Sequence, residues 1–90
     1  MDEDKQNEIE MLQDILDNVC KLIAETRSNY KELKELEEEV NNRFADKKIS
    51  KFTYDIELER IRRTYQNIDH SLSSLERQRK IATEKLRELE

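Results

Sequence analysis

Apolar side chains recur at alternating steps of three and four residues along almost the whole chain, and this period constrains the fold more than any other feature. The spacing places apolar residues in the a and d positions of a heptad, which form one stripe along an α-helix. Glycine and proline, the two residues that most disfavour helix, are absent. The sequence therefore predicts an all-α protein whose helices pack through a single apolar seam.

The seam runs through two segments, which we expect to form helices at about residues 4–46 and 51–90, with a turn at about 46–50. Nine of eleven seam positions are apolar or aromatic in the first segment and ten of eleven in the second. Residues 1–90 would then form a single helical-hairpin domain. The predicted intrachain core comprises Ile9, Leu12, Leu16, Val19, Ile23, Tyr30, Leu33, Val40, Phe44, Tyr54, Leu58, Ile61, Tyr65, Ile68, Leu72, Leu75, Ala82, Leu86 and Leu89.

Three seam positions are polar, namely Thr26, Glu37 and Arg79. Polar residues in a seam reduce stability but can specify register and partner. Glu37 is expected at the edge of the seam, where its carboxylate would be paired locally with Arg62 on the second helix. The alternative is that Glu37 and Arg79 mark the place where a partner helix enters.

A turn between the two segments competes with one continuous helix. Phe44 and Tyr54 are ten residues apart, which keeps the two seams in phase and favours a continuous helix in a parallel coiled coil. That helix, however, would place Lys47 and Lys51 in the seam and leave Phe52 outside it. The continuous helix therefore remains only the alternative.

The residues around position 50 favour the turn. Ser50 is a preferred N-cap, and Ile49 and Tyr54 occupy the two positions of a hydrophobic staple around it. Lys47 and Lys48 would complement the dipole at the end of the first helix. The sequence thus predicts a two-helix antiparallel coiled-coil hairpin.

Antiparallel pairing of Phe44 with Tyr54 makes the residue numbers of every facing pair add up to 98. Val40 then faces Leu58, and each a position of one helix faces a d position of the other. The hairpin would be about 60 Å long at 1.5 Å per residue.

Some apolar residues lie outside the seam. Ile15, Leu22 and Leu36 all occupy g positions of the first helix, with Met11 close by. A two-helix hairpin buries little core by itself, so this second stripe predicts a homodimer that forms a four-helix bundle. The predicted protein interface comprises Met11, Ile15, Leu22, Leu36, Ile49, Phe52, Ile56 and Ile81.

No arrangement of residues suggests catalysis. The chain has no glycine-rich phosphate loop, no CxxC pair and no HExxH motif. Cys20 lies about 12 Å along the axis from the level of His70, too far for a catalytic pair. We therefore expect no catalytic residue, no cofactor, no metal site and no enzymatic activity.

Charge disfavours nucleic acid as a partner. Residues 1–50 hold 8 Lys/Arg against 14 Asp/Glu, a net of −6, and residues 51–90 hold 9 against 8, a net of +1. The N-terminus is polar and no long apolar run occurs, so we expect neither a membrane segment nor a signal peptide, and a cytoplasmic location.

The sequence thus favours a non-enzymatic protein-interaction or assembly module that binds itself and an unidentified protein. Two alternatives remain open. One is a structural rod or scaffold component, and the other is a small helical regulator that contacts nucleic acid through basic patches of the second helix.

Overall fold

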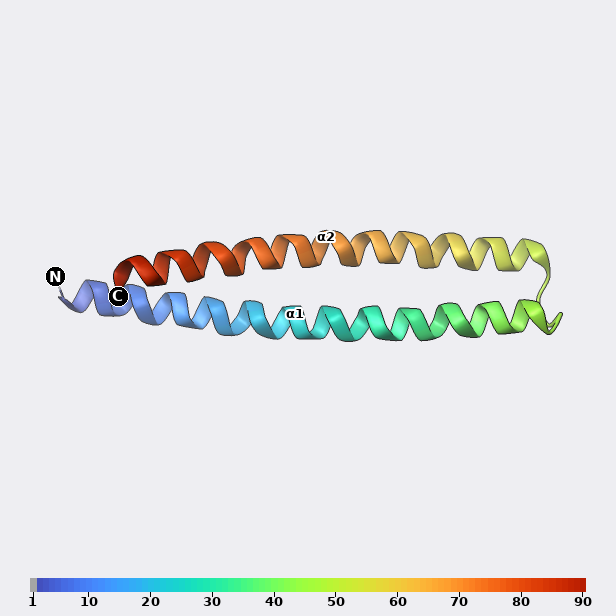
Figure 1. The fold of residues 1–90 in the computed structure, drawn as a ribbon, viewed down its shortest axis with the longest axis horizontal. Helices are drawn as coiled ribbons and strands as arrows, with labels where there is room; N and C mark the ends of the chain where they lie inside the picture. The colour runs from blue at the N-terminus through green and yellow to red at the C-terminus, as the bar shows by residue number, and fades with distance from the viewer. Residues whose placement is uncertain (1) are drawn as a thin grey trace.

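The computed structural model describes residues 2–90 and consists of two long helices that lie side by side (Figure 1). Helix α1 spans Asp2–Ala45 and helix α2 spans Lys51–Leu89. The chain reverses direction between them, so both chain ends lie at the same end of the hairpin (Figure 1). The prediction of an antiparallel helical hairpin is confirmed, and the continuous helix is wrong.

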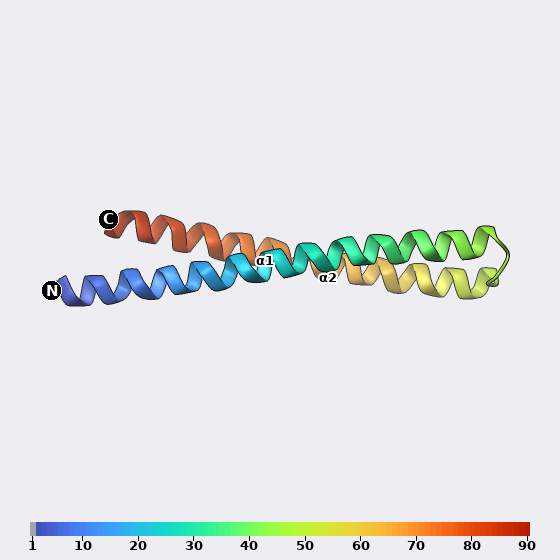
Figure 2. The same ribbon diagram turned by 90° about the horizontal axis from the view of Figure 1, so that it is seen from below.

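The hairpin is long and narrow, with extents of 69 × 15 × 13 Å. Turned by 90°, the two helices cross once near their middle (Figure 2). They therefore wrap around each other while remaining in contact along their length. Such wrapping keeps a seven-residue apolar repeat facing the partner helix, because 3.6 residues per turn would otherwise rotate it away.

The end of α1 is closed by a Schellman motif. The amide of Lys48 donates to the carbonyl of Arg43 at 2.9 Å, and the amide of Lys47 donates to the carbonyl of Phe44 at 3.0 Å. This pair of bonds requires a left-handed residue, a position that glycine usually occupies. Here Lys47 takes it, with φ at 61°. The turn therefore forms at some cost in backbone strain.

The start of α2 is capped as the sequence predicts. Ser50 has an extended backbone, and its side-chain oxygen accepts a hydrogen bond from the amide of Thr53 at 3.1 Å. Ile49 and Tyr54, on either side of this cap, both pack against the apolar cluster between the helices. The cap and the flanking apolar pair together set the direction in which the chain enters α2.

The core between the helices is thin. All of its buried side chains belong to the seam, and all but Ile23 occupy d positions. They are Val19, Ile23, Leu33, Val40, Ile61, Ile68 and Ala82. A d position lies next to the g position of its own helix, where Ile15, Leu22 and Leu36 add apolar cover.

Most other predicted core residues are half-buried. They are Ile9, Leu12, Leu16, Tyr54, Leu58, Tyr65, Leu72, Leu75, Leu86 and Leu89. Tyr30 and Phe44, by contrast, remain 41% and 36% exposed. Both occupy a positions of α1.

Each of these two rings instead lies against an aromatic ring on α2. Phe44 stacks on Tyr54, with 4.2 Å between ring centroids, and Tyr30 packs at a tilt against Tyr65, at 5.2 Å. The stack pairs the two residues that the expected register places face to face. The two aromatic pairs therefore hold the helices in register over roughly the third of their length nearest the turn.

Candidate interaction surface

The seam of the hairpin is bordered by two long flanks of different chemistry. In an antiparallel pair, e positions of both helices border one side of the seam and g positions border the other. The e flank consists of Gln13, Cys20, Arg27, Lys34 and Asn41 on α1, with Asp55, Arg62, Asp69, Glu76 and Thr83 on α2. The g flank consists of Ile15, Leu22, Asn29, Leu36 and Arg43 on α1, with Glu57, Thr64, Ser71, Gln78 and Lys85 on α2.

The e flank is polar throughout. Arg27 and Glu76 form an ion pair across it at 3.5 Å, which joins the two helices. Both side chains are largely exposed, so the pair contributes a few tenths of a kcal/mol at most. A flank that carries charges of both signs along its length is well solvated.

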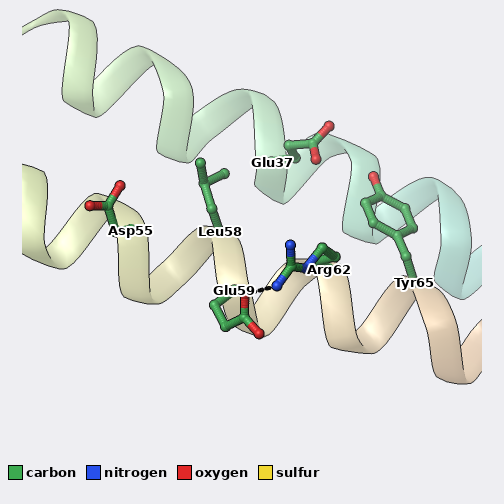
Figure 3. A pocket seen from close by; sticks show the side chains of 6 residues that line it. All are labelled: Glu37, Asp55, Leu58, Glu59, Arg62 and Tyr65. Atoms are coloured by element: carbon green, nitrogen blue, oxygen red, sulfur yellow. Dashed lines mark hydrogen bonds and ion pairs between the residues drawn. The ribbon is translucent and has the colours of Figure 1, made fainter.

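A hollow of about 360 Å³ opens on the e flank towards the turn, lined by Glu37, Asp55, Leu58, Glu59, Arg62 and Tyr65. Figure 3 shows Leu58 and Tyr65 reaching from α2 towards α1, with Glu37 on the opposite side. Arg62 bonds to Glu59 on its own helix (Figure 3). The expected pairing of Arg62 with Glu37 is therefore wrong. The Arg62 guanidinium pairs instead with the carboxylate of Glu59, one turn away on the same helix.

Tyr65 lines this hollow from α2. Burial against α1 raises the pKa of the Tyr65 hydroxyl above its usual value, and the nearby Glu37, Tyr30 and Glu38 raise the pKa further. The phenol therefore stays protonated at neutral pH. It can donate a hydrogen bond but provides neither a base nor a nucleophile.

The g flank carries three exposed apolar side chains in one column. Ile15, Leu22 and Leu36 are 40–47% exposed there. Met11 and Ile81 are also exposed and occupy c positions, which border the g column on the outer side of each helix. Five of the eight residues predicted to form the interface thus lie on one face.

Two hollows lie along the g flank beside the leucines. One, of about 480 Å³, is lined by Leu22, Thr26, His70, Ser71, Ser74 and Leu75. The other, of about 360 Å³, is lined by Asn29, Glu32, Leu33, Leu36, Thr64 and Ile68. In both, α1 contributes an exposed leucine and α2 contributes at least one small hydroxyl side chain. The face therefore alternates between an apolar ridge and a shallow groove.

The remaining three predicted interface residues lie near the turn. Ile49 is half-buried and packs against the core cluster, so it is not free for a partner. Phe52 is 75% exposed and lines a third hollow with Ile56, on the outer side of α2. This patch is separate from the g flank, because b and f positions point away from the seam.

The two residues considered for chemistry lie on different flanks of the hairpin. Cys20 is an exposed free thiol on the e flank, whereas His70 lines the hollow beside Leu22 on the g flank. Within residues 2–90, no group of three His, Cys, Asp or Glu side chains could hold a metal ion.

The arginines near the start of α2 are engaged within their own helix. Arg60 pairs with Glu57 at 3.7 Å, and Arg62 and Arg63 both pair with Glu59. Each of these guanidinium groups thus has a carboxylate beside it. This arrangement lowers the positive potential that a phosphate backbone would require.

Neither helix of the described chain is long and apolar enough to cross a membrane. No protein-family model, curated protein or solved structure matches this chain. The surface of the hairpin itself is therefore the basis for inferring a function.

Proposed function

We propose that this chain is a non-enzymatic protein-interaction module that associates with a second copy of itself through the g flank. The observation that carries this proposal is the contrast between the two flanks. The e flank is charged, whereas the g flank presents Ile15, Leu22 and Leu36 beside shallow grooves. Exposed apolar side chains that recur along one flank favour an interaction site there.

The small core supports the same proposal. Only seven side chains are buried in the described hairpin, and chains of this size rarely reach useful stability from one thin core. Covering the g flank with a second copy would remove the exposed part of Ile15, Leu22 and Leu36 from water, at about 1 kcal/mol per side chain. A four-helix bundle would therefore be more stable than two separate hairpins.

The test is the molar mass of the purified chain by light scattering over a concentration series. We expect a mass of two chains that falls to one when Ile15, Leu22 and Leu36 are all replaced by Gln, with helicity retained in circular dichroism. Phe52→Gln with Ile56→Gln is the matched control, because both residues lie outside the g flank, and it should leave the dimer intact. A wild-type mass of one chain at every concentration would overturn the proposal.

The dimer would leave the patch around Phe52 and Ile56 exposed. We assign this patch to a further protein partner, because a phenylalanine that is 75% exposed is costly to keep in water. A cytoplasmic location suits the exposed thiol of Cys20, which would stay reduced there.

A structural rod is a second candidate, and the length of the hairpin supports it. Extents of 69 × 15 × 13 Å would let the module separate two bound components by several nanometres. In that case cross-linking the helices would preserve function, whereas shortening both by matched heptads would abolish it. A regulator of nucleic acid is less favoured, because the arginines near the turn are already paired with glutamates.

A further inference from the structure

Two hairpins that meet through their g flanks can be related by a two-fold axis in two ways. If the axis runs along the hairpin, both turns lie at the same end and α1 of each copy packs on α2 of the other. If the axis lies across the hairpin within the interface, the turns lie at opposite ends and α1 packs on α1. Both arrangements are isologous and close the assembly at two copies.

The charges of the helices distinguish the two arrangements. Helix α1 holds 6 Lys/Arg against 13 Asp/Glu, a net of −7, and α2 holds 9 against 7, a net of +2. With the turns together, each acidic helix would have two α2 helices as its neighbours. With the turns apart, the two acidic helices would lie against each other along their length, which like charges oppose.

The residues beside the g flank also disfavour the arrangement with the turns apart. Glu25, Glu32 and Glu39 occupy c positions on α1 and are all exposed. With the turns apart and Leu22 opposite Leu36, Glu25 of one copy would lie next to Glu32 of the other. The two-fold axis generates this contact twice, so the dimer would contain two such repulsive pairs.

With the turns together, the same glutamates meet hydrogen-bond donors. The stack of Phe44 on Tyr54 fixes which levels of α1 and α2 coincide, and an axis along the hairpin keeps those levels in the dimer. Each of the three glutamates then lies level with an exposed c residue on α2 of the other copy. The facing sets are Glu25 with Ser74, Glu32 with Asn67, and Glu39 with Arg60.

Resting on the self-association proposed above, we infer that the dimer is a four-helix bundle with both turns at the same end, in which the acidic α1 of each copy packs on α2 of the other. The two exposed Phe52 side chains are then displayed at one end of the bundle, and the chain termini at the other. The Cys20 thiols lie on opposite e flanks, outside the interface.

The test is the distance between nitroxide spin labels attached at the turn, measured by pulsed electron paramagnetic resonance. The labelled chain carries Lys48→Cys in a Cys20→Ser background, because Lys48 is exposed in the turn and outside the g flank. We expect an interspin distance of about 20–40 Å, two to three helix diameters. Circular dichroism and light scattering on the same sample report whether the hairpin and its dimer are intact.

A dimer whose labels are about 55 Å apart or more would overturn this inference and leave self-association standing, because the turns would then lie at opposite ends of a 69 Å hairpin. A sample with the mass of one chain and no dipolar signal would overturn both.

A second pair of variants tests the arrangement without spin labels. Glu39→Cys mixed with Arg60→Cys, both in the Cys20→Ser background, should form a disulfide between chains, whereas Asn29→Cys alone should not.

Discussion

The ring of Phe44, near the end of α1, stacks on the ring of Tyr54 in the first turns of α2, with 4.2 Å between centroids and 11° between planes. The Tyr54 hydroxyl also donates to the side-chain oxygen of Asn41 at 2.6 Å. One side chain thus makes both an apolar and a polar contact across the seam, next to the turn. These contacts close the hairpin and determine which residues face each other along the rest of it.

Removing the ring of Tyr54 should therefore weaken the hairpin strongly. Tyr54→Ala loses the stack and the bond to Asn41, and we expect the free energy of unfolding to fall by about 2–4 kcal/mol. Tyr54→Phe keeps the ring and should cost only about 1 kcal/mol for the hydrogen bond. Urea unfolding followed by circular dichroism, at one fixed protein concentration, measures both values. Equal losses in the two variants would mean that the stack contributes nothing.

The left-handed backbone of Lys47 should be relieved by glycine. Lys47→Gly removes the clash of a β-carbon at φ of 61°, and we expect a gain of about 0.5–1 kcal/mol in the free energy of unfolding. Lys48→Gly is the matched control, because position 48 has no such φ and should lose stability through greater freedom of the unfolded chain. Thermal unfolding of the two variants should give melting temperatures that move in opposite directions.

The cap on α2 provides a third prediction. Ser50→Ala removes the oxygen that accepts from the amide of Thr53, and we expect a loss of about 1 kcal/mol in the free energy of unfolding. Ser50→Asp restores an acceptor and places a negative charge at the helix N-terminus, so it should match the wild type or exceed it. An aspartate variant as unstable as the alanine variant would argue against the cap.

Tyr65 makes the stability sensitive to alkaline pH. Its pKa is raised in the folded chain, mainly by burial, so the folded state holds this proton more tightly than the unfolded state. Its contribution is therefore complete below about pH 10, the ordinary pKa of tyrosine, and is lost as pH rises through the folded pKa. Absorbance titration of tyrosinate should show a late-titrating group that disappears in Tyr65→Phe but persists in Tyr54→Phe.

The sequence alone determined the course of the backbone. The seven-residue period specified two helices, the absence of glycine and proline left them uninterrupted, and Ser50 with its apolar neighbours placed the turn correctly. These features are local, because helix, cap and turn depend on residues within a few positions of each other. The helices consequently begin and end within two residues of the expected bounds.

The tertiary structure decided how much of each side chain is buried and which charged group it pairs with. Heptad position gives the direction of a side chain, but not how much of it the facing helix encloses. Tyr30 and Phe44 therefore stay partly exposed in their seam positions, while Ile49, outside the seam, packs against the core. Arg62 likewise pairs with Glu59 on its own helix instead of Glu37 across the seam. Burial of a side chain depends on its volume and on the surfaces of both helices. Ion pairing depends on which carboxylate lies nearest to the guanidinium. Neither therefore follows from the heptad period of the sequence.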